Sequence, residues 1–105
     1  MTKDQGPLEG KVLVDRIVAG AQEKKAENIV VLDIGKTSSM ADWLVICEGE
    51  NPMHTRAISD SIVTGLKQTG TRPLHYEGHD EGRWVLVDYV DVLVQYPSDG
   101  KLQKR

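Results

Sequence analysis

The sequence has little cysteine and no long hydrophobic run, and each absence excludes a class of protein. Its single cysteine, Cys47, cannot form an internal disulfide and lies in an apolar run, which indicates a buried thiol in a reducing compartment. A membrane-spanning helix needs about 20 consecutive apolar residues, and the apolar runs here extend over only a handful. The N-terminus also lacks a basic and then apolar signal segment, so the sequence predicts a cytoplasmic protein without membrane contact.

A surplus of basic residues is also missing. The chain has 13 Lys and Arg against 16 Asp and Glu, which gives a formal net charge of -3. Binding to RNA or DNA depends on Lys and Arg side chains that displace counterions from phosphates, and most of the basic residues here are scattered. We therefore expect little direct RNA binding, and a basic protein rather than RNA as the partner.

The length of 105 residues leaves room for one domain, residues 1–105, around one core, without repeats or low-complexity linkers. Residues 8–26 have the apolar spacing of an amphipathic helix, and Gly20 within it indicates close packing against a neighbour. Residues 29–34 form a largely apolar, β-branched run that predicts a strand. Residues 43–47 are apolar at every position, which predicts a strand buried on both faces within a helix-covered sheet.

The clearest start of a helix follows the second predicted strand. Asn51 can cap this helix, Pro52 can occupy its first position, and Gly70 with Pro73 supplies the stop. Strands predicted over 74–77, 84–88 and 92–96 make the helix a βαβ crossover and the last two strands an antiparallel hairpin. The sequence thus predicts an α/β fold with a mixed sheet, of about five strands and two main helices in the order α-β-β-α-β-β-β, and a mobile tail over 97–105.

One segment resembles part of a phosphate-binding loop, and one group of residues resembles a metal site. Gly35–Lys36–Thr37 looks like the end of such a loop, but Val30 stands where the motif needs its first glycine, so a loop between strands explains the segment better. A second group could hold zinc or iron, although its spacing favours a solvated turn. This group contains His75, Glu77, His79 and Asp80, with His54 as a distant fourth ligand.

Two pairs of side chains could support catalysis. Asp88 and Asp91 could act as paired carboxylates, but they are three positions apart, and a nucleotidyltransferase needs two aspartates alternating on one strand after a Gly-Ser loop. A role in the turn between the last strands explains Asp88 instead. Cys47 and His54 could act as nucleophile and base, but a thiol in an apolar strand has no cation to lower its pKa, which favours a core cysteine.

Trp84 opens a predicted strand directly after the polar residues 80–83. Alternation along this strand places Trp84, Leu86 and Asp88 on one face and Val85, Val87 and Tyr89 on the other. A tryptophan at the end of a strand is either a core residue or a half-exposed anchor for a protein partner. The composition leaves both interpretations open.

Two longer stretches together resemble the Iojap or ribosomal silencing factor family. The run DIGKTSSMADWLVICEGENPMHTRAISDSIV resembles the family's loop of the D-x-x-x-K-S-S kind, its strand ending in I-C-x-G and its helix with R-A-I-A-D. The run TRPLHYEGHDEGRWVLVDYVDVLVQ resembles a Pro-Leu strand, an E-G turn, W-V-L-V-D and D-V-x-V-H. The chain departs from the family at Val90, where Gly is usual, at Gln95, where His is usual, and in lacking a C-terminal L-E-x-L-W helix.

The resemblance implies a nucleotidyltransferase-like fold without the catalytic aspartates, and therefore a translational regulator rather than an enzyme, with no catalytic residue, cofactor or metal. It implies binding to the large ribosomal subunit through the fourteenth ribosomal protein, a basic protein on the intersubunit face. This binding would block subunit joining and repress translation when nutrients are limiting. The partner-binding residues that we expect are Trp84, Leu86, Asp88, Tyr89 and Asp91.

The expected oligomeric state is a monomer or a weak homodimer. The alternative function is a nucleotide-binding or phosphoryl-transfer enzyme of the same fold, which would use Asp88, Asp91 and Lys36.

Overall fold

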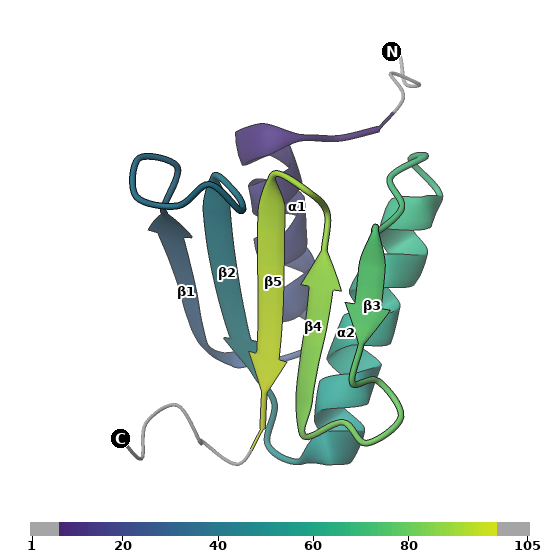
Figure 1. Ribbon diagram of the computed structural model, residues 1–105. Helices are drawn as coiled ribbons and strands as arrows, with labels where there is room; N and C mark the ends of the chain where they lie inside the picture. The colour runs from purple at the N-terminus through teal and green to yellow at the C-terminus, as the bar shows by residue number, and fades with distance from the viewer. Residues whose placement is uncertain (1–6, 99–105) are drawn as a thin grey trace.

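The computed structural model describes residues 7–98, which form a sheet and a layer of helices (Figure 1). The elements are α1 (Gly10–Glu23), β1 (Glu27–Asp33), β2 (Trp43–Glu48), α2 (Pro52–Lys67), β3 (His75–Glu77), β4 (Trp84–Asp88) and β5 (Val92–Pro97). This order confirms the predicted α/β fold with two helices and a five-stranded mixed sheet.

The end of β5 differs from the sequence prediction. The tail predicted over 97–105 begins too early, because Pro97 closes β5 and Ser98 is fully buried. The backbone N–H and the hydroxyl of Ser98 both donate to the carbonyl of Arg83, each at 3.1 Å. Pro97 and Ser98 are therefore part of the folded domain, and the rest of the predicted tail lies outside the described residues.

The strands lie in the order β1-β2-β5-β4-β3. β2 and β5 run parallel, and all other neighbouring strands are antiparallel. β4 and β5 form the predicted antiparallel hairpin. α2 is the predicted crossover helix, and it connects β2 to β3. The two strands that α2 joins are not neighbours, since β5 and β4 lie between them. The hairpin at the end of the domain therefore fills the middle of the sheet.

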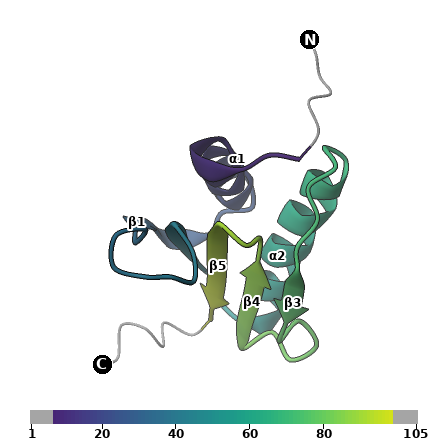
Figure 2. The same ribbon diagram turned by 45° about the horizontal axis from the view of Figure 1, so that its top comes forward.

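Both helices pack on the same face of the sheet (Figure 2). α1 buries one stripe along its length, and α2 buries another at the spacing of an amphipathic helix. As predicted, Asn51 caps α2, because its side-chain oxygen accepts a hydrogen bond from the backbone N–H of His54 at 2.8 Å, and Pro52 is the first helical residue. Within residues 7–98, neither helix has the length and apolar character of a membrane span.

The two helices approach each other closely at Gly20 of α1. A Cβ atom at this position would lie 2.9 Å from Cγ1 of Ile62 on α2, closer than real Cβ atoms come to other heavy atoms. The absence of a side chain therefore permits the contact, and the close packing predicted at Gly20 is confirmed.

Candidate functional site

One face of the sheet packs against α1 and α2, and no helix among residues 7–98 covers the other face, which we call the open face (Figure 2). Cross-strand partners lie on the same face, so the register assigns the side chains. The partners Val45, Val94 and Val87 are buried and belong to the helix side. The alternate positions form two rows of partners on the open face: Leu32, Leu44, Leu93, Asp88 and His75 in one, and Val30, Ile46, Gln95, Leu86 and Glu77 in the other.

The prediction that β2 is buried on both faces is wrong. Val45 and Cys47 are fully buried against the helices, whereas Leu44 and Ile46 on the open face are only half-buried. They are shielded by the side chains of the neighbouring strands and not by a second layer of helices. The apolar run of β2 thus serves two purposes, since one face belongs to the core and the other is accessible to a partner.

The apolar part of the open face continues across β1, β2 and β5. Val30 and Leu32 of the edge strand are 41% and 42% exposed, and they pair with Ile46 and Leu44 of β2. Leu93 on β5 continues the row. An exposed apolar surface of this kind typically marks an interaction site.

Three of the predicted partner-binding residues share this open face on β4. Trp84 is 40% exposed at the start of the strand, and Leu86 and Asp88 follow at alternate positions. The side chain of Asp88 is held in place, since its Oδ1 accepts a hydrogen bond from the backbone N–H of Val90 at 2.8 Å. Trp84, Leu86 and Asp88 therefore combine an aromatic side chain, an aliphatic side chain and a carboxylate on one strand.

The other two predicted residues lie elsewhere. Tyr89 is 6% exposed within the core cluster, where burial raises the pKa of its phenol above the ordinary value. Asp91 is half-buried, and its Oδ2 accepts a hydrogen bond from the backbone N–H of Gly10 at 2.7 Å. In this structure Tyr89 packs the core and Asp91 holds the start of α1, and neither side chain projects from the open face of β4.

The sequence prediction missed the apolar residues that β1, β2 and β5 contribute to the open face. They are Val30, Leu32, Leu44, Ile46 and Leu93. The available signal is the apolar character of residues 43–47, which also fits a strand with one face in the core and one face uncovered. The strand order determines which strands lie next to Trp84, and this order cannot be predicted from the local sequence pattern.

The residues considered as metal ligands are dispersed, in agreement with the turn that their spacing favours. His75 and Glu77 lie on the open face of β3, whereas Nε2 of His79 lies 3.0 Å from Oδ2 of Asp60 on α2. Tyr76 donates its hydroxyl hydrogen to Oδ1 of the same Asp60 at 2.9 Å, so Asp60 connects α2 to β3 and the following turn. Residues 7–98 contain no group of three or more His, Cys, Asp and Glu that could hold a metal ion.

Cys47 is the buried core cysteine that the sequence favours, and it does not form a nucleophile and base with His54. Cys47 lies in the core, where burial raises the pKa of its thiol to about 12 and disfavours the reactive thiolate. The ring of His54 is held by backbone groups, because its Nδ1 accepts from the N–H of Glu50 at 3.0 Å and its Nε2 lies 2.9 Å from the carbonyl of Lys24. Both residues stabilise the fold.

The loop with Gly35–Lys36–Thr37 connects β1 to β2, as predicted. The backbone N–H groups of Thr37 and Ser38 donate to the carbonyl of Ile34, at 3.0 and 2.8 Å, and so close a turn. A strand follows this turn, whereas a phosphate-binding loop needs the N-terminus of a helix there. The loop therefore lacks the element that binds phosphate in that motif.

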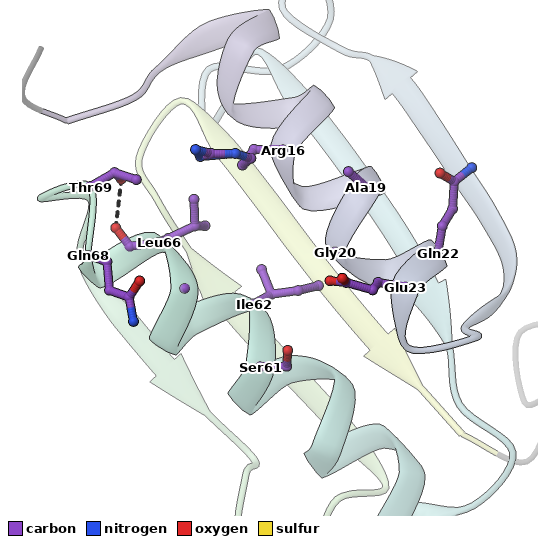
Figure 3. A pocket seen from close by; sticks show the side chains of 11 residues that line it. Arg16, Ala19, Gly20, Gln22, Glu23, Ser61, Ile62, Leu66, Gln68 and Thr69 are labelled. Atoms are coloured by element: carbon purple, nitrogen blue, oxygen red, sulfur yellow. Dashed lines mark hydrogen bonds between the residues drawn. The ribbon is translucent and has the colours of Figure 1, made fainter. Parts of the chain in front are cut away.

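A hollow of about 650 Å³ lies between α1 and α2 on the helix side (Figure 3). Ile62 and Leu66 contribute apolar side chains to its lining, and its ionisable side chains are Arg16 and Glu23. Its hydroxyl groups have no histidine among the lining residues to act as a base, and the hydroxyl of Thr69 donates to the carbonyl of Leu66 at 2.7 Å. The hydroxyl of Thr69 is therefore engaged with the backbone and not with Glu23, the carboxylate of the lining.

The family model described as "Ribosomal silencing factor during starvation" matches residues 7–98. The chain belongs to this family. A ribosomal silencing factor from Bacillus subtilis is 37% identical over 84 residues, which are 80% of this chain and 71% of that protein. A second ribosomal silencing factor, from Halalkalibacterium halodurans, is 31% identical over 87 residues. These residues are 83% of this chain and 74% of that protein.

Two solved structures have the same fold as this chain. A crystal structure of a protein from Chromobacterium violaceum has a TM-score of 0.83 at 27% identity. The match covers 87% of this chain and 76% of that protein's chain. A crystal structure from Bacillus halodurans has a TM-score of 0.81 at 28% identity. The match covers 90% of this chain and 93% of that protein's chain. The relatives' names describe a regulatory role rather than an enzymatic one.

Proposed function

We propose that this chain is a ribosomal silencing factor that acts by docking and not by catalysis. It binds the large ribosomal subunit through the fourteenth ribosomal protein, a basic protein on the intersubunit face. Its bulk then blocks joining of the small subunit and represses translation when nutrients are limiting. It acts in the cytoplasm, as a monomer or a weak homodimer, with little direct contact to RNA.

The observation that carries this proposal is the open face of the sheet. An uncovered face that carries half-buried Leu44 and Ile46 on β2 and a 40% exposed Trp84 on β4 buries apolar area when a partner docks on it. Exposed tryptophans with aliphatic neighbours are the residues that contribute most to binding energy in protein interfaces. Membership in the family supports the ribosome as the site of docking.

The charge of the chain supports a basic protein as the direct partner. The net charge of -3 opposes a stable grip on ribosomal RNA, whose phosphates attract cations. On the open face, Asp88 and Glu77 flank Leu86, so carboxylates border the apolar residues. Lys and Arg side chains of a basic protein complement this border and give the association its orientation.

A subunit-joining assay tests the proposal. Purified small and large subunits are mixed with the chain, and light scattering follows the formation of whole ribosomes. We expect the chain to reduce the extent of joining, and Trp84→Ala to restore it. The control is Val12→Ala, which removes an apolar side chain that is 62% exposed on α1, on the other side of the sheet. Full joining in the presence of excess chain contradicts the proposal.

A further inference from the structure

Val90, at the tip of the turn between β4 and β5, has a strained backbone. Its φ is +80°, a region that β-branched residues rarely adopt. The backbone N–H of Asp91 donates to the carbonyl of Tyr89 at 3.0 Å, which closes a three-residue turn around Val90. A turn closed in this way around a residue of positive φ corresponds to the strained form of the γ-turn.

The side chain of Val90 gives the fold little in return for this strain. It is 61% exposed, so it contributes little to the core. The hydrogen bonds of the turn come from backbone groups and from Asp88, and a glycine at this position keeps all of them. An exposed apolar side chain on a strained backbone, at a place where glycine fits better, indicates a role outside the folding of the chain.

Met40, in the loop between β1 and β2, lies near Val90. Both residues line a hollow of about 230 Å³, and Met40 is 74% exposed. Backbone hydrogen bonds fix the loop against the turn, because the N–H groups of Asp42 and Trp43 donate to the carbonyl of Asp91 at 2.9 and 3.1 Å. The two apolar side chains thus border one hollow on a fixed frame.

Carboxylates surround this pair of side chains. Asp42 and Asp91 line the same hollow, and Asp88 supports the turn from the open face. Among residues 7–98, none of these three carboxylates forms an ion pair with a basic side chain. Ser38 and Ser39 also line the hollow, so it complements a Lys or Arg side chain, whose methylene stem packs against Val90 and Met40 and whose charge meets the carboxylates.

We propose that Val90 and Met40 form a second apolar contact, continuous with the open face through Asp88, for the same basic ribosomal protein. This inference rests on the proposed function and adds the chemistry of the second contact. The partner places a Lys or Arg side chain in the hollow, with its methylene stem against Val90 and Met40 and its charge beside Asp42 and Asp91. The strain at Val90 is retained because the side chain is used in binding.

Two variants with a control test this contact in co-sedimentation with purified large subunits and in urea denaturation. Val90→Gly removes the strain and the side chain, so its urea midpoint rises while binding weakens about tenfold. Met40→Ala leaves the backbone unaffected, so its midpoint stays the same while binding weakens about threefold. Val12→Ala, with nearly the same exposed fraction as Val90, leaves binding unchanged.

The outcomes separate this contact from the proposed function. If Val90→Gly and Met40→Ala bind as tightly as the parent while Trp84→Ala binds more weakly, the second contact is wrong and docking through the open face stands. If the urea midpoint of Val90→Gly does not rise, the inference from strain is wrong. If Trp84→Ala also binds like the parent, the docking face itself is wrong and the second contact fails with it.

Discussion

The carboxylate of Asp91 accepts a hydrogen bond from the backbone N–H of Gly10, at 2.7 Å and across 81 positions of the sequence. Gly10 is the first residue of α1, and Glu9 at the N-cap makes no side-chain hydrogen bond to the helix. Asp91 therefore supplies the cap from the turn between β4 and β5. The same turn that presents Val90 also fixes the start of the first helix.

Asp91→Ala removes this cap and leaves an N–H group of α1 without its acceptor. We expect the free energy of unfolding to fall by about 1 kcal/mol, the usual cost of losing a helix cap. Urea denaturation at neutral pH measures the change. Asp15→Ala is the control, because it removes the same charge from an exposed pair with Lys11 and should cost less than about 0.5 kcal/mol. Equal losses in the two variants would show that Asp91 is not a cap.

Two helical glycines should respond to alanine in opposite directions. Gly20→Ala places a methyl group 2.9 Å from Cγ1 of Ile62 and should destabilise the fold by about 1–3 kcal/mol, as overpacking does. Gly65→Ala meets no atom within 4 Å and should stabilise by about 0.5–1 kcal/mol, because alanine favours the helix. Thermal unfolding of both variants checks the pair. A stabilised Gly20→Ala variant contradicts the close contact between the helices.

Alkaline conditions should destabilise the fold through Cys47. Burial raises the pKa of its thiol from 9.0 to about 12, so the folded state keeps a proton that the unfolded state loses. The stabilisation is fully present below pH 9.0 and disappears as the pH rises to about 12. Within this window the free energy of unfolding falls by about 1.4 kcal/mol per pH unit for one such group.

Urea denaturation of the parent and of Cys47→Ala across this range measures the effect. The parent should lose stability already between pH 9.0 and 10.0, whereas Cys47→Ala should lose it only where the buried tyrosines titrate. Burial also raises the pKa of Tyr89 and Tyr96 above 10.0, so both proteins become less stable at higher pH. Identical slopes below pH 10.0 would mean that the Cys47 thiol is not desolvated in the folded state.

The sequence predicted the elements because their signals are local. Asn51 and Pro52 marked the start of α2, and strong β-branched and apolar runs marked β4 and β5. The strand order could not be predicted in the same way, since the insertion of β5 between β2 and β4 depends on how distant segments pack. Whether helices cover one face of the sheet or both depends on the same packing. The apolar run of β2 therefore fits burial on both faces as well as burial on one face.

The candidate site was predicted only along β4. Alternation placed Trp84, Leu86 and Asp88 on one face, which the structure confirms. The same alternation places Tyr89 on the opposite face, where it packs in the core, and the turn takes Asp91 to the start of α1. The φ of +80° at Val90 is a conformation that glycine adopts without strain, and nothing local in the sequence marks it, since valine favours extended backbone.

The affinity of the Trp84→Ala variant for purified large ribosomal subunits tests the docking face most directly. Trp84 opens β4 and is 40% exposed, so its loss should lower the free energy of unfolding by about 1–3 kcal/mol and leave the variant folded, which urea denaturation checks. We predict a dissociation constant at least about tenfold higher than that of the parent, with Val12→Ala unchanged. A Trp84→Ala variant that binds large subunits as tightly as the parent would contradict docking through the open face.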